Sequence, residues 1–122
     1  MSPRVLLIAH GSGTLPVLAR LLRLSGFEVI AADCLKTALE RIADPAPQCA
    51  VVDIGVPDDS GPLLLQELSK RGIGGVAISG NCEAEYTRLC RAAGFFHLVK
   101  PIAFHILLAL LESTACAGEA KK

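Results

Sequence analysis

Three polar residues stand directly at the ends of apolar runs in this sequence, and their side chains could act together on one ligand. Asp53 follows the run 49–52, Ser79 follows 76–78, and Lys100 follows 95–99. If these runs are parallel strands of one sheet, their ends meet at one rim, where open α/β folds bind ligands. The sequence therefore predicts a site that combines a carboxylate, a hydroxyl and an ammonium group.

Expected strands and helices alternate along the chain and would hold these residues in place. Continuous apolar runs predict buried parallel strands at 5–9, 27–32, 49–54, 75–79 and 95–99. Helical periodicity, with turn signals between, predicts helices at 15–24, 35–43, 61–70, 82 or 83 to 93, and 101–113. Five strand–helix units in this order predict an α/β fold with a five-stranded, parallel, doubly wound sheet.

The composition limits the class of protein. The chain has 122 residues, 52% of them hydrophobic, and 12 basic and 12 acidic residues give a net charge of zero. We expect one domain, residues 1–114, a flexible C-terminal tail, residues 115–122, and no direct binding to nucleic acid. No apolar run approaches the roughly 18 residues of a membrane helix, so no membrane contact is expected. Five scattered cysteines without C-x-x-C spacing indicate reduced thiols and a cytoplasmic location.

The spacing of these residues resembles the receiver domain of bacterial two-component response regulators, the CheY-like family. The resemblance covers residues 4 to about 113 and rests on four short motifs in order: Asp53-x-x-x-Pro57-x-x-x-Gly61, Ser79-Gly80, Ala93-Gly94 and Lys100-Pro101. It implies a flavodoxin-like (βα)5 fold and phosphorelay signal transduction. It also implies that Asp53 accepts a phosphoryl group from a histidine kinase or phosphotransfer protein, while Ser79 and Lys100 contact the phosphoryl oxygens.

Physical chemistry agrees with these implied roles. In phosphoryl transfer, a protein mainly positions the reacting groups and stabilises their negative charge. A phosphoaspartate adds negative charge and strong acceptor oxygens, which a nearby ammonium and hydroxyl group would stabilise. On this hypothesis the chain is a signalling phosphoprotein, and we expect it not to be an enzyme.

The chain departs from the family directly after its first strand. Family members carry two adjacent acidic residues there that bind Mg²⁺, whereas this chain has Ala9 and His10. Mg²⁺ takes oxygen ligands, which neither alanine nor imidazole supplies. Asp53 would be the one carboxylate that remains of the acidic set, so we expect only a weak Mg²⁺ site at Asp53.

One residue of the fifth strand is assigned a role by the resemblance. Family members usually carry an aromatic switch residue three positions before the lysine, and this chain has His97 there. A histidine could swing as a tyrosine does, and its charge would depend on pH. The alternative is a partly exposed polar strand residue without a switching role.

The last helix carries two apolar rows. The first, at 104, 107, 108 and 111, is expected to face the core. The second, Ile102, Ile106 and Leu110, recurs at i, i+4 and i+8 and is expected on the outer face. An outer apolar row predicts a contact surface for a homodimer or another protein. A helix that is simply rich in apolar helix formers is the alternative.

Three functional hypotheses remain open from the sequence. The first is a receiver domain of phosphorelay signalling with Asp53 as the phosphoacceptor. The second is a pseudo-receiver that acts as a phosphorylation-independent protein-interaction module, because Ala9 and His10 replace the acidic pair. The third is a small flavodoxin-like ligand-binding or enzymatic domain, which is disfavoured because no spare general base or nucleophile accompanies the predicted site.

Overall fold

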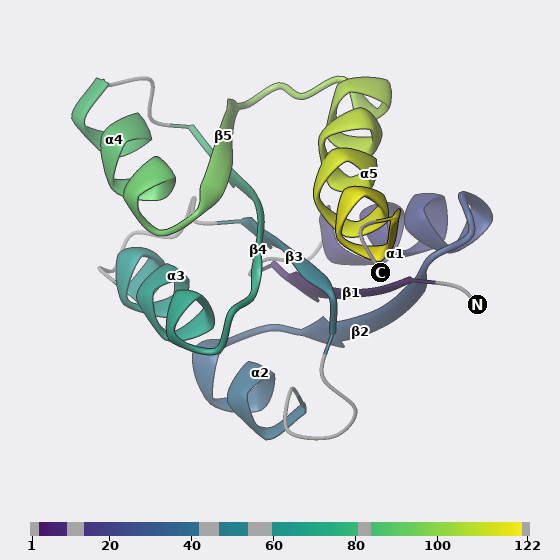
Figure 1. Cartoon of the computed structure of the whole chain (residues 1–122), viewed down its shortest axis with the longest axis horizontal. Helices are drawn as coiled ribbons and strands as arrows, with labels where there is room; N and C mark the ends of the chain where they lie inside the picture. The colour runs from purple at the N-terminus through teal and green to yellow at the C-terminus, as the bar shows by residue number, and fades with distance from the viewer. Residues whose placement is uncertain (1–2, 10–13, 42–46, 54–59, 81–83, 121–122) are drawn as a thin grey trace.

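Five parallel strands form one sheet in the order β2-β1-β3-β4-β5 (Figure 1). The computed structural model describes residues 3–9, 14–41, 47–53, 60–80 and 84–120. The strands are β1 (Arg4–Ile8), β2 (Glu28–Ala32), β3 (Cys49–Asp53), β4 (Gly74–Ser79) and β5 (Phe95–Val99). The central strands β1, β3 and β4 are almost entirely buried, which explains their continuous apolar sequences.

Five helices cover the two faces of the sheet, so the predicted flavodoxin-like, doubly wound (βα)5 fold is confirmed. They are α1 (Thr14–Leu24), α2 (Leu35–Arg41), α3 (Ser60–Lys70), α4 (Ala84–Ala92) and α5 (Phe104–Ala120). Figure 1 shows α1 and α5 together on one side of the sheet and α2, α3 and α4 on the other.

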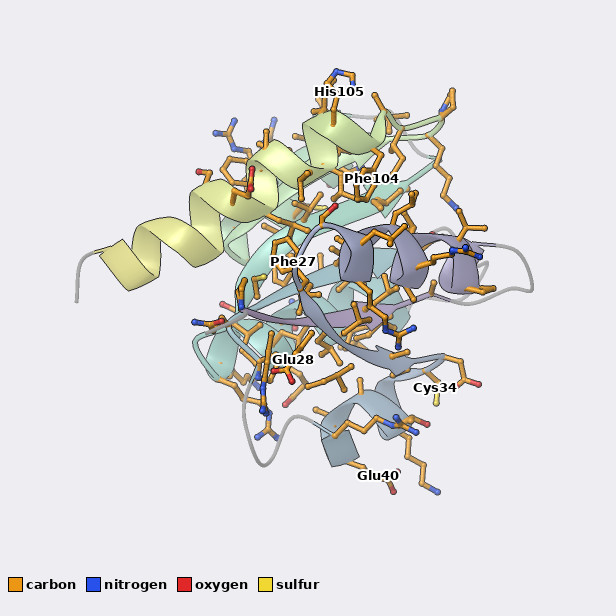
Figure 2. The ribbon with its side chains drawn as sticks, turned by 90° about the vertical axis from the view of Figure 1, so that its right-hand side faces the viewer. Phe27, Glu28, Cys34, Glu40, Phe104 and His105 are labelled. Atoms are coloured by element: carbon orange, nitrogen blue, oxygen red, sulfur yellow. The ribbon has the colours of Figure 1, made fainter. Side chains whose placement is uncertain are left out.

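Two apolar cores separate the helices from the sheet. The layer under α1 and α5 contains Leu22, Phe27 and Leu107, and Phe104 packs against it from α5 (Figure 2). The layer under α2, α3 and α4 contains Leu65 and Phe95. Alternate residues of each strand enter opposite layers, as the period of two in a strand requires.

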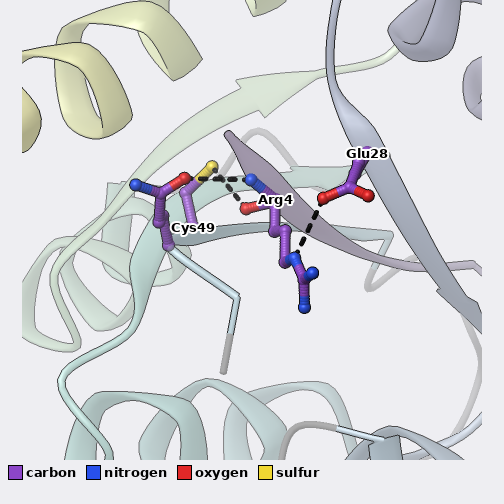
Figure 3. A network of polar contacts seen from close by, with 4 residues as sticks. Arg4, Glu28 and Cys49 are labelled. Atoms are coloured by element: carbon purple, nitrogen blue, oxygen red, sulfur yellow. Dashed lines mark hydrogen bonds and ion pairs between the residues drawn. The ribbon is translucent and has the colours of Figure 1, made fainter. Parts of the chain in front are cut away.

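The amino ends of three strands are tied together by a polar network around Arg4 (Figure 3). The backbone N–H of Arg4 donates to Oε1 of Gln48 at 2.9 Å, and its side-chain Nε lies 3.0 Å from Oε2 of Glu28. The Cys49 thiol lies 3.9 Å from the Arg4 carbonyl oxygen. These contacts join β1 to β2 and β3 at the sheet edge opposite the predicted site, so their role is structural.

The last helix differs from the prediction at both ends. It begins at Phe104, three residues after Pro101, because the carbonyl of Ala103 accepts the first helical hydrogen bonds, from the N–H groups of Ile106 and Leu107. It continues to Ala120, where helix-favouring alanines lengthen it. The helix therefore includes most of the segment 115–122, whose predicted flexibility stays a prediction.

The second apolar row of this helix is only partly on the outer face. Ile106 is 45% exposed, but Ile102 and Leu110 are half buried and pack against the core under α1 and α5. The prediction that all three point outward was wrong. Ile102 precedes the helix, and Leu110 is three residues from fully buried Leu107, which places it at the margin of the buried face.

Candidate functional site

The three polar residues singled out by the sequence lie at neighbouring strand ends. Asp53 is the last residue of β3, Ser79 is the last of β4, and Lys100 directly follows β5. The backbone N–H of Lys100 donates to the carbonyl oxygen of Ser79 at 2.8 Å, which continues the ladder between β4 and β5. Parallel pairing of β3, β4 and β5 therefore brings the three residues to one rim, as predicted.

Asp53 and Lys100 form an ion pair at this rim. The ammonium Nζ of Lys100 donates to Oδ2 of Asp53 at 2.8 Å, which confirms the predicted proximity. The Asp53 side chain is 4% exposed, whereas that of Lys100 is 40% exposed. A buried carboxylate is expensive to keep charged without compensation, so the ammonium stabilises it while retaining its own contact with water.

Removing Lys100 should therefore cost more than removing an ordinary surface partner. We expect Lys100→Met to lower the free energy of unfolding by about 1–3 kcal/mol, since Asp53 loses a charged hydrogen bond. Glu28→Gln, which removes the exposed ion pair with Arg4, should cost under about 1 kcal/mol. Urea denaturation measures both, and equal small losses would show that the rim pair is only a surface contact.

A second set of contacts links Ser79 to β5 and α4. The hydroxyl Oγ of Ser79 lies 2.6 Å from Nε2 of His97, and Nδ1 of His97 lies 2.8 Å from Oγ1 of Thr87. Ser79 is 1% exposed, and His97 and Thr87 are half buried. The predicted switch position is thus occupied by an imidazole held between two hydroxyl groups. Whether it switches stays a prediction.

The environment of His97 gives folding a pH dependence. Burial lowers the pKa of His97 below its ordinary value of 6.5. Unfolded chains therefore bind this proton at higher pH than folded ones. The contribution of neutral His97 to the free energy of unfolding is complete above pH 6.5. It is lost as the pH falls through the lower pKa that His97 has in the folded state.

Replacing His97 tests this directly. In His97→Gln, which carries no titrating ring, we expect the free energy of unfolding to fall less steeply below pH 6.5 than in the wild type. Denaturation curves at several pH values measure the two slopes. Identical slopes would mean that His97 has the same pKa in the folded and unfolded chains.

The residues described at this rim do not match what Mg²⁺ requires. Ala9 is 1% exposed and presents a methyl group where a carboxylate ligand would be needed. Within the described ranges, no three His, Cys, Asp or Glu side chains are grouped so that they could hold a metal ion. His10 lies outside the described residues. Asp53 alone, already paired with Lys100, is a poor donor set for this ion.

Thr87 was missed by the sequence reasoning. It lies on α4, half buried and three residues before buried Cys90, so it shares the face of α4 that turns to the sheet. A hydroxyl residue on an otherwise apolar helix face was the available signal. Its partner on β5 could not be identified without the packing of α4 on that strand.

Comparisons with known proteins identify the family to which these features belong. The sequence model of the response regulator receiver domain matches residues 5–112, so the chain belongs to the response regulator receiver family. A search of curated proteins finds no match.

Solved structures show the same fold. A CheY-like receiver domain protein from Methanospirillum hungatei is 23% identical over 100% of both chains, with a TM-score of 0.87. A receiver domain protein from Clostridium thermocellum is 21% identical over 98% of this chain and 99% of its own, with a TM-score of 0.85. NtrX from Brucella abortus is 24% identical, with a TM-score of 0.84; the match covers 99% of this chain and 29% of NtrX.

Proposed function

We propose that this receiver domain acts in phosphorelay signalling, with Asp53 as the phosphoacceptor. The observation that carries the proposal is the ion pair at the rim, where an almost fully buried carboxylate lies 2.8 Å from the Lys100 ammonium. Receiver domains in general work with histidine kinases or phosphotransfer proteins, and we propose such a donor for Asp53.

The proposed reaction needs little covalent chemistry from the protein. A carboxylate oxygen of Asp53 forms a bond to phosphorus while the bond from phosphorus to the donor histidine nitrogen breaks. Lys100 then balances the added negative charge, and the Ser79 hydroxyl can donate to a phosphoryl oxygen. Asp53 is consumed as the acceptor in each transfer, so we propose no catalytic turnover of a separate substrate.

Phosphoramidate, a small donor with a phosphorus–nitrogen bond, tests the proposed response of the rim. We expect it to shift the backbone amide signals of Ser79 and Lys100 in nuclear magnetic resonance spectra of the wild type. The same treatment of Asp53→Asn should leave both signals in place. Unchanged wild-type spectra, or equal shifts in the variant, would refute the assigned acceptor.

The buried methyl group of Ala9 favours a second candidate function. Without the acidic pair, the domain could act as a pseudo-receiver, an interaction module that binds its partner whether or not Asp53 is phosphorylated. Partner binding distinguishes the two functions: Asp53→Asn should abolish a phosphorylation-dependent response but leave the affinity of an interaction module unchanged.

We further propose a protein contact at the exposed part of α5, centred on Ile106. This side chain is 45% exposed, and burying that exposed part in a homodimer would contribute roughly 0.7–1.4 kcal/mol per subunit. Ile106→Glu should therefore weaken self-association in sedimentation experiments, whereas Leu63→Glu, at an exposed position of α3, should not. A strictly monomeric wild type, or equal effects of the two substitutions, would argue against a dimer contact here.

We propose a cytoplasmic location for the domain, on the basis of the sequence alone. In the part of the chain that the structure describes, no helix combines the length and apolar character needed to cross a membrane.

A further inference from the structure

The imidazole of His97 joins two hydroxyl groups that belong to different parts of the fold. Ser79 ends β4 at the proposed phosphorylation site, and Thr87 is the fourth residue of α4. The two contacts, 2.6 Å to Ser79 and 2.8 Å to Thr87, use both ring nitrogens. A continuous hydrogen-bonded chain therefore connects the rim of the sheet to a helix.

The hydrogen-bonded series Ser79, His97 and Thr87 has the same order of groups as an activated serine nucleophile, its base and the group that orients the base. Asp53 is the proposed acceptor at this rim, and the Ser79 hydroxyl beside it already contacts Nε2 of His97, so we assign Ser79 a supporting role. The arrangement fits a different task, which is to control the direction in which the Ser79 hydroxyl points its proton.

A neutral imidazole carries one ring proton, on Nδ1 or on Nε2, so His97 can be in either of two tautomers. When Nδ1 carries the proton, it donates to Thr87 and Nε2 accepts the proton of Ser79. When Nε2 carries the proton, it donates to Ser79, Thr87 donates to Nδ1, and the Ser79 proton can point to another acceptor. Only this second state allows Ser79 to donate to a phosphoryl oxygen on Asp53.

We propose that Thr87 is a positioning residue that, through His97, sets whether the Ser79 hydroxyl can donate a hydrogen bond at the rim. The proposal rests on the proposed phosphorylation of Asp53 for its purpose, but the coupling of Thr87 to Ser79 exists in the unmodified chain. A phosphoryl oxygen that takes the Ser79 proton favours the state in which Thr87 donates, so α4 responds through Thr87.

Charged and titratable side chains occur on α4, the helix that contributes Thr87. The described part of α4 also carries Glu85, Arg88 and Arg91, all exposed, and the buried thiol of Cys90. On β4, Ala77 is the direct neighbour of His97 in the ladder and brings no charge. Burial lowers the pKa of His97, so the two neutral states are the relevant ones above pH 6.5.

Nuclear magnetic resonance of the unmodified protein above pH 6.5 tests the coupling. Thr87→Val keeps the shape of the side chain but removes its hydroxyl, whereas Thr87→Ser keeps the hydroxyl. We expect Thr87→Val to shift the ring-nitrogen signals of His97 and the amide signal of Ser79. The population of the ring orientation seen here should fall roughly fivefold relative to the alternatives, the effect of losing about one hydrogen bond. Thr87→Ser should preserve the wild-type signals.

A His97→Phe variant distinguishes an effect of Thr87 that passes through His97 from a general disturbance of α4. In His97→Phe, which keeps a ring but makes neither hydrogen bond, adding Thr87→Val should no longer shift the Ser79 signal. The proposal is overturned if Thr87→Val leaves Ser79 and the ring unchanged, or if valine and serine act alike. It is also overturned if the effect on Ser79 persists in the His97→Phe background. These outcomes are independent of whether Asp53 accepts a phosphoryl group.

Discussion

Replacing Ala9 and His10 with aspartate together is expected to raise the affinity of the rim for Mg²⁺ by about a hundredfold. A carboxylate within about 4 Å of a cation contributes on the order of 1–4 kcal/mol, and each 1.4 kcal/mol is a factor of ten, so two such groups have a large effect. Titration with Mg²⁺, followed by the amide signals around Asp53, measures the affinity of both proteins. The wild type should bind only weakly.

The matched control replaces the same two residues with asparagine, which has nearly the same shape but no charge. This variant should bind Mg²⁺ far less tightly than the aspartate variant. Without the ion, the aspartate at position 9 is buried near Asp53 and should destabilise the fold, and added Mg²⁺ should restore stability. Saturation of the wild type at sub-millimolar Mg²⁺ would contradict our interpretation of the rim.

The largest expected loss of stability comes from a residue far from this rim. Gly75, near the start of β4, has a φ of 154°, and a Cβ added there would overlap the carbonyl oxygen of Ala50 on β3. Neither backbone can retreat, because both strands lie inside the sheet. We expect Gly75→Ala to lower the free energy of unfolding by about 3 kcal/mol or more.

Gly80→Ala provides the comparison, since a Cβ at Gly80 meets no atom within 4 Å. It should change the free energy of unfolding by less than about 1 kcal/mol. Chemical denaturation of the two variants measures the difference. A Gly75→Ala protein as stable as Gly80→Ala would show that β3 and β4 are further apart than this structure has them.

The order of strands and helices could be predicted from the sequence because each strand is a short apolar run with a turn signal at its end. Asp53, Ser79 and Lys100 could be placed together for the same reason, since parallel strands bring their carboxyl ends to one rim. Boundaries were less predictable where competing local signals existed. Pro101 suggested the first turn of α5, but the carbonyl that begins the helix belongs to Ala103.

Contacts between elements could not be predicted from periodicity. The spacing of Ile102, Ile106 and Leu110 indicates a common row, but the width of the buried face of α5 depends on how closely α1 and the sheet pack against it. The contact between His97 and Thr87 likewise depends on the docking of α4 on β5. These tertiary distances carry no signature in a single sequence.

Phosphorylation of Asp53 is tested by the intact mass of the protein after incubation with acetyl phosphate and Mg²⁺. We predict that the wild type gains the mass of one phosphoryl group, that the variant with aspartate at positions 9 and 10 gains it faster, and that Asp53→Asn gains none. A gain that persists in Asp53→Asn, or a wild type that gains no mass, would show that Asp53 is not the phosphoacceptor of this protein.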